Sequence, residues 1–364
     1  MIVAGGTGGH IFPAIRLADE LKTRNIGEVL FVASSKSQDR EILEGKAIRF
    51  QTLAISSLKS SGILDILEFS MQLFIGTIES IFILLRFRPD VLVGFGGYVS
   101  GPIVLLASLS GIKTIIHEQN VYPGKANRLL VRFAHKIAIS FEETRDYLKG
   151  FESKIIFTGN PLRQSLKKSK ELKPAGNGFR VLVIGGSQGA HRLNILVPEA
   201  AGLISKDKKH MLEFIHISGP LEKDDVIKSY NDIGIKNSVF SFTEDMGELY
   251  NNCDFVIARA GAMTVSELLS LAIPAILIPY PYAGGHQKLN ARVLEKIGSA
   301  ILLEEKALTP QTLQAAISSL MDRNILDIMS AKAANIQKPD ACSILIRTVT
   351  YVHSLRSFHK SRAH

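Results

Sequence analysis

Several features that would place the chain in a familiar class are scarce or missing. Its 364 residues include only two cysteines, Cys253 and Cys342, and no tryptophan. Two cysteines without metal-type spacing supply neither a disulfide framework nor a zinc site, which fits a reducing compartment. No stretch of 18 uncharged apolar residues occurs, so we expect no helix that spans a membrane. The sequence begins with a strand and a glycine turn, without the basic region and cleavage site of a signal peptide.

Three signatures of nucleotide binding are also missing. The P-loop pattern G-x-x-x-x-G-K-[ST] does not occur, and Ile11 takes the place of the third glycine of G-x-G-x-x-G after Gly6 and Gly8. No D-x-D carboxylate pair, of the kind that holds a metal-bound nucleotide sugar, is present. A departing diphosphate would therefore need helix dipoles and basic side chains. No cofactor is required on these grounds, and stimulation by a divalent cation stays open.

What the chain does contain favours a two-domain α/β protein. The hydrophobic content is 46%, and 29 glycines suit many tight turns between strands and helices. Its length is comfortable for two domains with separate cores. The formal charge of +9 attracts anions of any kind, such as nucleic acid, phospholipid headgroups or nucleotide sugars, without choosing among them.

The pattern of strand, glycine turn and helix occurs twice. A strand over 1–4 leads through a glycine turn into a helix predicted over 13–24, with Pro13 in its first turn. After a charged connection at 160–179 the same pattern returns, so that Gly185-Gly186-Ser187 corresponds to Gly5-Gly6-Thr7. We therefore expect two Rossmann-like, doubly wound parallel-sheet domains that face each other across a cleft. Their predicted bounds are 1–160 and 161–340, with a C-terminal helix over 341–364 that joins the first. The short first strand predicts a weakly protected edge.

The stretch from Arg259 to Asn290 is the clearest candidate ligand site. It combines a turn of small residues, an apolar helix that ends near Ala272, a strand over 275–278 and a loop rich in proline and glycine. A helix start beneath such a turn favours an anion such as a phosphate. Glu267, one turn into the helix, is suited to accept two hydroxyl protons from a ribose. A capped helix that leads into a buried strand is the alternative interpretation.

The segment 63–88 is mostly apolar, with one narrow polar stripe. Its polar residues recur at steps of three or four, as expected for one face of a helix; they are Asp65, Glu68, Gln72, Gly76 and Glu79. The remaining surface is more apolar than one sheet face needs. Either the helix lies partly in a membrane interface, with Arg86 and Arg88 against anionic lipid, or its own domain buries it on two sides.

Transfer to a hydroxyl acceptor requires a general base. His10, after the first glycine turn, and the pair His117-Glu118, at the end of a predicted strand, are the candidates. A histidine in such a place is more often a cap or a packing residue. Arg163, Arg259 and Lys288 supply positive charge for a diphosphate in this interpretation.

Six motifs together resemble those of the MurG family, bacterial transferases that move N-acetylglucosamine (GlcNAc) from UDP-GlcNAc to a lipid-linked muramyl-pentapeptide, lipid I. The motifs occur in order over nearly the whole chain, and they are GGTGGHIFPA (5–14), GFGGYVSGP (94–102), HEQN (117–120), TGNPLR (158–163), IGGSQGA (184–190) and RAGAMTVSE (259–267). The resemblance implies a GT-B fold whose C-terminal half binds UDP-GlcNAc. It also implies an inverting displacement that joins GlcNAc to the 4-hydroxyl of the acceptor's muramyl sugar and makes lipid II.

The resemblance assigns roles to particular residues. His10 takes the place of the family's suspected base, and Glu118 is a weaker catalytic candidate. The donor site implied is Thr7, Gly8 and Gly9 at the sugar and phosphate, Asn120 and Arg163 as further contacts, Ser187 at the diphosphate, Thr243 with Ala262, Met263, Thr264, Val265, Ser266 and Glu267 around the nucleoside, and Gln287 at the sugar. One departure is Gly284-Gly285, where relatives carry an acidic residue, so a contact with a sugar hydroxyl is expected to be missing or supplied by backbone.

The same resemblance implies partners and a location. The partners are UDP-GlcNAc, lipid I, an anionic membrane surface and other proteins of cell-wall synthesis, with no nucleic acid. The location implied is the cytoplasmic face of the bacterial plasma membrane, in peripheral association. Two other classes remain open: a UDP-GlcNAc 2-epimerase, which would form UDP-ManNAc from the donor alone, and a non-enzymatic nucleotide-sensing membrane adaptor, which would bind UDP without sugar transfer.

Overall fold

The chain folds into two compact units. The structure is a computed structural model that describes residues 1–46, 48–55, 62–166, 178–186, 189–243, 245–282 and 285–360, with the backbone alone for 356–360. Unit 1 comprises Met1–Arg163 and Pro339–His364, and unit 2 comprises Gln164–Lys338. Each unit is described by itself.

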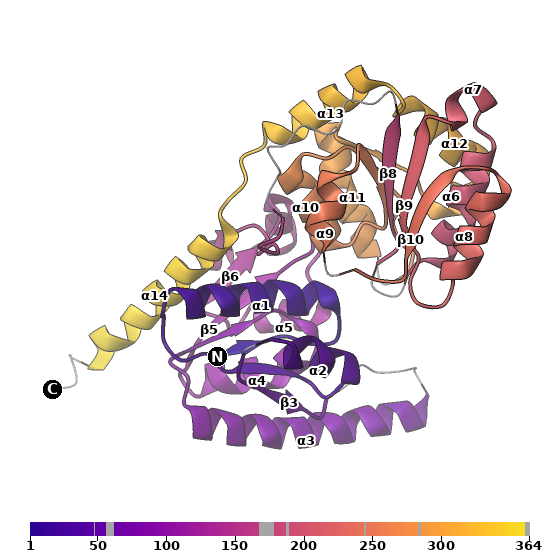
Figure 1. Ribbon diagram of the computed structural model, residues 1–364. Helices are drawn as coiled ribbons and strands as arrows, with labels where there is room; N and C mark the ends of the chain where they lie inside the picture. The colour runs from indigo at the N-terminus through magenta and orange to yellow at the C-terminus, as the bar shows by residue number, and fades with distance from the viewer. Residues whose placement is uncertain are drawn as a thin grey trace. The chain divides into compact units, whose positions relative to one another are not determined.

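Unit 1 is built on a parallel sheet in the order β3-β2-β1-β4-β5-β6-β7 (Figure 1). Its strands are short apolar runs, as expected where helices cover both faces of a sheet. They are β1 (Ile2–Val3), β2 (Phe31–Ser34), β3 (Phe50–Leu53), β4 (Val91–Gly94), β5 (Lys113–Glu118), β6 (Lys136–Ile139) and β7 (Ile155–Phe157). The helices are α1 (Gly8–Thr23), α2 (Ser37–Glu44), α3 (Ile63–Phe87), α4 (Gly97–Leu109), α5 (Lys125–Leu130) and α14 (Ala341–Lys360), with 3-10 turns η1 (Glu142–Tyr147) and η2 (Glu152–Lys154).

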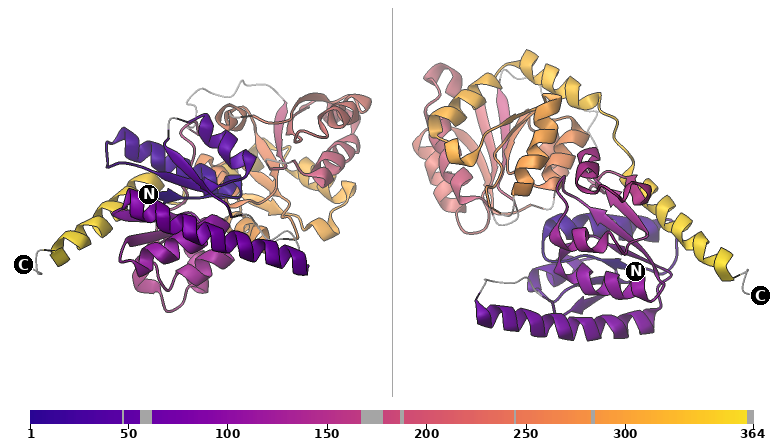
Figure 2. Two further views of the ribbon diagram at one scale, coloured as in Figure 1. Left: turned by 90° about the horizontal axis from the view of Figure 1, so that it is seen from below. Right: turned by 180° about the vertical axis from the view of Figure 1, so that it is seen from behind.

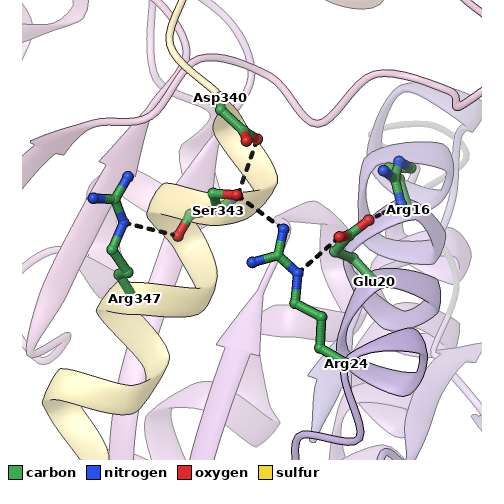
Figure 3. Close-up of polar contacts among 6 residues, drawn as sticks. All are labelled: Arg16, Glu20, Arg24, Asp340, Ser343 and Arg347. Atoms are coloured by element: carbon green, nitrogen blue, oxygen red, sulfur yellow. Dashed lines mark hydrogen bonds and ion pairs between the residues drawn. The ribbon is translucent and has the colours of Figure 1, made fainter.

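Two apolar clusters fill the faces of this sheet. One joins the strands to α1, α2 and α14, and the other joins them to α3, α4 and α5. Polar contacts also hold α14 on α1 (Figure 3). Arg24 donates from Nε to Glu20 at 2.8 Å and from Nη2 to the Ser343 hydroxyl at 2.9 Å. The C-terminal helix is therefore part of unit 1, although the chain reaches it only after unit 2.

Unit 2 repeats the architecture with a six-stranded parallel sheet in the order β10-β9-β8-β11-β12-β13. The strands are β8 (Phe179–Ile184), β9 (Leu212–Ile217), β10 (Lys236–Phe240), β11 (Phe255–Ala258), β12 (Ala275–Leu277) and β13 (Ala300–Leu302). The helices are α6 (His191–Gly202), α7 (Lys206–Lys209), α8 (Lys223–Asp232), α9 (Met246–Asn251), α10 (Ala262–Leu271), α11 (His286–Ile297), α12 (Pro310–Ser319) and α13 (Arg323–Ala334), with 3-10 turn η4 (Glu305–Ala307). The predicted α/β class with two parallel, Rossmann-like sheets is confirmed.

The first strand and helix differ from their predictions. Helix α1 begins at Gly8, five residues before the predicted start, so Pro13 lies inside the helix and not in its first turn. Gly8 and Gly9, predicted in the turn, form the start of the helix, whereas Gly5 and Gly6 do lie in a turn. Strand β1 is short but central, because β2 and β4 pair with it on either side and both of its residues are buried. The strand therefore does not lie at an edge of the sheet, and its low protection in hydrogen exchange stays a prediction.

Helix α3 turns Gly76, Ser80 and Leu84 inward and most of its large apolar side chains outward. Gly76 and Ser80 are buried, and a Cβ at Gly76 would lie 2.2 Å from the Ile55 side chain. Glu79 accepts a hydrogen bond from the Ala54 amide at 2.8 Å. The outward side chains Leu64 and Phe82 are 81% and 68% exposed. The helix lies along the outside of unit 1 (Figure 2), so the alternative in which the domain buries it on two sides is wrong.

By length and composition alone, α3 is apolar enough to cross a membrane, although the sequence contains no run of 18 uncharged apolar residues. That measure does not test the expectation that no helix spans a membrane. The packing of Gly76 against Ile55 and the hydrogen bond to Glu79 attach the helix along the unit.

Candidate active site

The glycine turns lie at the topological switch points of both sheets. In unit 1 the chain passes outward to β2 and β3 after β1, and to the opposite side after β4. The loops after β1 and β4 therefore flank the crevice at the carboxyl edge where ligands of open α/β sheets bind. The same relation holds in unit 2 for the loops after β8 and β11. The two repeated turns match in conformation, with φ of +92° at Gly6 and +99° at Gly186.

His10 lies in the first turn of α1, beside the glycine turn. Its Nδ1 lies 3.1 Å from the Thr7 hydroxyl oxygen, and the ring also hydrogen-bonds to the Gly5 carbonyl. Desolvation by burial lowers the pKa of His10, although the nearby Glu118 carboxylate opposes this shift. A neutral imidazole at pH 7 is the form that a general base requires.

The second glycine loop packs directly on this imidazole. A Cβ at Gly96 would lie 3.5 Å from His10 Nε2, and one at Gly97 would lie 2.5 Å from the Gly5 carbonyl oxygen. Both residues have positive φ, +85° and +79°. Glycine is therefore favoured at both positions by the backbone conformation, and at Gly97 also by the close approach to the Gly5 carbonyl oxygen.

Glu118 ends β5 and is surrounded by hydrogen-bond donors. One carboxylate oxygen accepts from the Asn120 amide at 2.9 Å, and the other from the Gly124 amide at 2.9 Å and Asn127 Nδ2 at 2.8 Å. The side chain is only 2% exposed. These bonds fix the loop that follows the strand, so the geometry favours a supporting role over proton transfer.

Several buried amide atoms around this loop have no hydrogen-bond partner in the described part of the chain. They are Gln119 Oε1, Asn127 Oδ1 and both amide atoms of Asn160. His117, beside them, donates from Nε2 to the Gly159 carbonyl at 3.1 Å, and burial lowers its pKa to about 4. A polar group that is buried without a partner is costly, so these atoms offer hydrogen bonds to a bound ligand or water.

Arg163 follows in the TGNPLR segment. Its guanidinium lies over the Phe12 ring at 4.1 Å from the centroid, which places it beside the start of α1. Its Nε is buried and has no hydrogen-bond partner among the described residues. The side chain thus places a positively charged guanidinium close to the glycine turn. Thr7, Gly8, Gly9 and His10 occupy that helix start, and Thr7 makes no capping bond with its side chain.

In unit 2, α10 begins directly beneath the turn after β11. Glu267 is 5% exposed and accepts a hydrogen bond from the Tyr250 hydroxyl at 2.9 Å. Ala262, Val265 and Ser266 are buried, whereas Met263 and Thr264 are partly exposed. The helix thus starts at Ala262, and its first turn is accessible at Met263 and Thr264, where backbone N–H groups of a helix start can bind an anion.

Gln287 connects two loops of this edge. Its Oε1 accepts from the Ala260 amide at 3.1 Å and from the Tyr280 amide at 3.0 Å. Asn290, one turn on, donates to the Ala260 carbonyl at 3.2 Å. The carbonyl end of the Gln287 amide therefore holds the loops after β11 and β12 together.

The two cations expected to serve a diphosphate in unit 2 are engaged by carboxylates. Arg259 forms an ion pair with Glu305 and donates to the Ile278 carbonyl at 3.1 Å. Lys288 pairs with Glu304 at 2.6 Å. Arg259 therefore links the ends of β11 and β12 to the turn after β13, which is a structural task.

The remaining predicted residues are placed as follows. Thr243 accepts a hydrogen bond from the Asp245 amide at 3.1 Å, and Asn120 is partly exposed after β5. Ser187 and Gly284 lie outside the described residues. Gly285 precedes α11 with φ +73°. Within the described ranges no group of three or more His, Cys, Asp or Glu side chains is placed to hold a metal ion.

Sequence reasoning missed three residues that organise these sites. Asn127 and Tyr250 hold the carboxylates of Glu118 and Glu267, and Asp39 accepts from the Gly6 amide at 2.8 Å. None belongs to the six motifs. The available signal was weak: each is a polar side chain on a helix that is otherwise apolar toward the core.

Two parallel sheets with glycine turns at both switch points are the architecture of the GT-B fold, and the family models identify the chain as a glycosyltransferase. Residues 1–139 match the N-terminal domain of glycosyltransferase family 28, and residues 180–343 match its C-terminal domain. A UDP-N-acetylglucosamine--N-acetylmuramyl-(pentapeptide) pyrophosphoryl-undecaprenol N-acetylglucosamine transferase of Thermoanaerobacter sp. (strain X514) is 37% identical over 96% of this chain and 98% of its own length. A Myxococcus xanthus relative of the same name is 38% identical over 95% of this chain and 90% of its own.

Solved structures agree with these matches. The crystal structure of Acinetobacter baumannii MurG is 28% identical, with a TM-score of 0.77, and covers 96% of this chain and 98% of its own. The structure of S. aureus MnaA with UDP has a TM-score of 0.69 and covers 98% and 96%, but at 13% identity it shows the fold alone. The chain belongs to the MurG family of glycosyltransferases.

Proposed function

We propose that the chain transfers GlcNAc from UDP-GlcNAc to the 4-hydroxyl of the muramyl sugar in lipid I, and so makes lipid II for peptidoglycan. The observation that carries this proposal is the match over 96% of the chain to relatives named for that transferase activity. Sites on both units take part: the first supplies the base and the second holds the donor nucleotide.

His10 is the proposed base. Its low pKa keeps the ring neutral, and the Thr7 and Gly5 bonds orient it at the start of α1. The imidazole takes the proton of the acceptor hydroxyl, whose oxygen attacks the anomeric carbon opposite the departing UDP. One displacement inverts the α-linked donor to a β-linked product. Glu118 holds the neighbouring loop, and its negative charge stabilises the imidazolium that forms.

The proposed donor contacts follow the family resemblance. Glu267 accepts the ribose hydroxyls, and the Tyr250 hydroxyl supports this role because it fixes the carboxylate in a buried position. Gln287 reaches the sugar through its amide nitrogen. The remaining contacts are those of Thr7, Gly8, Gly9, Asn120, Arg163, Ser187, Thr243 and the helix start at 262–266. No cofactor is assigned, and stimulation by a divalent cation is tested by chelation.

We also propose that α3 brings the enzyme to the cytoplasmic face of the plasma membrane as a peripheral protein. Lipid I stays in the bilayer, so its enzyme must approach the surface. The outward apolar side of α3 supports this role, because Ile63, Leu64 and Phe74 are 79%, 81% and 65% exposed. Arg86 and Arg88 at the end of the helix are suited to anionic headgroups.

The test uses labelled UDP-GlcNAc with a short-chain lipid I analogue. We expect labelled disaccharide lipid from the wild-type chain. Folded protein that binds UDP and yields no such product would contradict the proposal, and UDP-ManNAc formed from the donor alone would indicate an epimerase.

His10→Ala tests the assignment of the base. We expect turnover to fall by about 100- to 10,000-fold, since the variant loses general-base catalysis, with donor affinity nearly unchanged. UDP affinity is measured in parallel by calorimetry. Equal turnover of variant and wild type would remove His10 from this role.

A further inference from the structure

Asp39 is a buried carboxylate behind the first glycine turn. It lies in α2 and is 2% exposed. Its Oδ2 accepts hydrogen bonds from the Gly6 amide at 2.8 Å and from the Ser34 hydroxyl, at the end of β2. A buried carboxylate is costly unless donors surround it, so its position is closely fixed by these two partners.

The glycine turn is shaped around this carboxylate. A Cβ at Gly5 would lie 2.9 Å from the Ser34 amide nitrogen and 3.1 Å from Asp39 Oδ2. Gly6 has φ +92°, and its N–H points back to Asp39 instead of outward. The carboxylate thus attaches the turn to β2 and α2. Helix α1 begins at Gly8, two residues beyond the attached amide.

The glycine turn also supplies hydrogen-bond partners to the His10 ring. The His10 ring bonds to the Gly5 carbonyl and lies 3.1 Å from the Thr7 hydroxyl oxygen. A displacement of Gly5 and Gly6 therefore moves the acceptors that orient the imidazole. The same Gly5 carbonyl is in close approach to Gly97, so the loop after β4 follows any such displacement.

We propose that Asp39 is a positioning residue for the transfer reaction, which acts on His10 both through its attachment of Gly5 and Gly6 and through its own negative charge. This inference depends on the proposed role of His10 as the base. Asp39 does not reach the reacting atoms itself. It belongs to none of the six motifs, and nothing in the family resemblance assigned it a role.

The charge of Asp39 provides a readout that a purely structural role would not change. The ionisable groups that face His10 are Glu118 from β5, Asp39 from α2 and His117 from β5. Both carboxylates favour the imidazolium and so raise the pKa of His10, against the larger effect of burial. The base works when deprotonated, so activity rises with pH through this pKa. Loss of the Asp39 charge should move that rise to lower pH.

The experiment compares three variants of the full chain with wild type, with kcat, KM for UDP-GlcNAc and the pH profile of kcat/KM measured for each. Asp39→Asn preserves the shape and, with its carbonyl oxygen toward Gly6, both hydrogen bonds. For this variant we expect a turnover between those of Asp39→Ala and wild type. We also expect the acid limb of its kcat/KM profile to move to lower pH by a few tenths of a unit. Asp39→Ala removes the attachment, and we expect kcat to fall about 10- to 100-fold with UDP affinity unchanged. Glu41→Gln, an exposed acid on the same helix, is the matched control and should resemble wild type.

The outcomes separate this inference from the proposed function. Wild-type chain without product contradicts the function itself. Two results with an active wild type would together overturn the role of Asp39. They are an acid limb of kcat/KM for Asp39→Asn at the same pH as for wild type, and a turnover of Asp39→Ala equal to that of wild type. If Asp39→Ala does not fold, as judged by thermal unfolding and UDP binding, the pH limb of Asp39→Asn decides the question alone. A shifted limb supports the inference, and an unshifted limb refutes it.

Discussion

Gly97 occupies a position where any side chain would meet the backbone of the first glycine turn. Its φ is +79°, and a Cβ would lie 2.5 Å from the Gly5 carbonyl oxygen, which no flexible neighbour can relieve. We expect Gly97→Ala to lower the free energy of unfolding by about 1–3 kcal/mol. It should also reduce turnover, because the same loop packs on His10.

Gly101, in the same helix, provides the control. A Cβ there meets nothing within 4 Å, so Gly101→Ala should raise the free energy of unfolding by about 0.5–1 kcal/mol. Chemical denaturation of both variants measures the difference. Equal stability of the two would show that the close approach to Gly5 is not a real constraint.

At the residue scale, the sequence predicted positions but not partners. Glycine-rich turns in a sequence indicate where the backbone adopts a conformation that favours glycine. The sequence therefore predicted the site at His10 and the site at the start of α10. Asn127 and Tyr250, which donate to Glu118 and Glu267, lie 9 and 17 residues away from them in sequence, and their pairing depends on the fold. The same dependence on the fold explains Arg259 and Lys288. The sequence predicted that their charges serve a diphosphate, but in the structure they pair with Glu305 and Glu304.

At the scale of elements, α3 shows what periodicity does and does not reveal. Its polar stripe was visible in the sequence, but the direction of the stripe was not. A helix of a soluble domain turns its apolar side to the core, whereas α3 turns Gly76 and Ser80 inward. Small inward residues allow close packing and leave the large apolar side chains outside. Sheet order also decided the place of β1, which is central because β2 and β4 pair with it.

We expect the outward side of α3 to govern membrane binding. Leu67, Phe74 and Phe82 are 60%, 65% and 68% exposed, so changing all three to Gln should alter the free energy of unfolding by about 0.5 kcal/mol per residue or less. Affinity for vesicles with anionic lipid should fall on the order of 100-fold or more, since three apolar side chains no longer enter the interface. Vesicle flotation measures the binding.

The control for α3 is an exposed apolar residue of unit 2. Leu221 is 92% exposed, and Leu221→Gln should leave flotation unchanged. Binding of wild type should also weaken as salt is raised, because Arg86 and Arg88 meet anionic headgroups. A triple variant that floats like wild type would exclude α3 as the membrane surface.

At the scale of the whole molecule, the two units differ in how the chain builds them. Unit 2 is one continuous segment, whereas unit 1 is completed only by α14 from the end of the chain. Leu345, Ile346 and Val352 are 0%, 4% and 0% exposed and belong to the same apolar cluster as α1 and β2. The core of unit 1 therefore depends on a helix that the chain reaches only after unit 2.

This construction predicts that a cavity in α14 destabilises one unit and spares the other. Leu345→Ala should cost unit 1 about 2–5 kcal/mol, because the side chain is fully buried among apolar neighbours. Hydrogen exchange should then show faster exchange in β1, β2 and α1, with β8, β9 and β11 unchanged. Tyr351→Ala, at a position of α14 that is 54% exposed, is the control and should change neither unit by more than about 1 kcal/mol. Equal loss of protection in both sheets after Leu345→Ala would mean that the two units unfold as one.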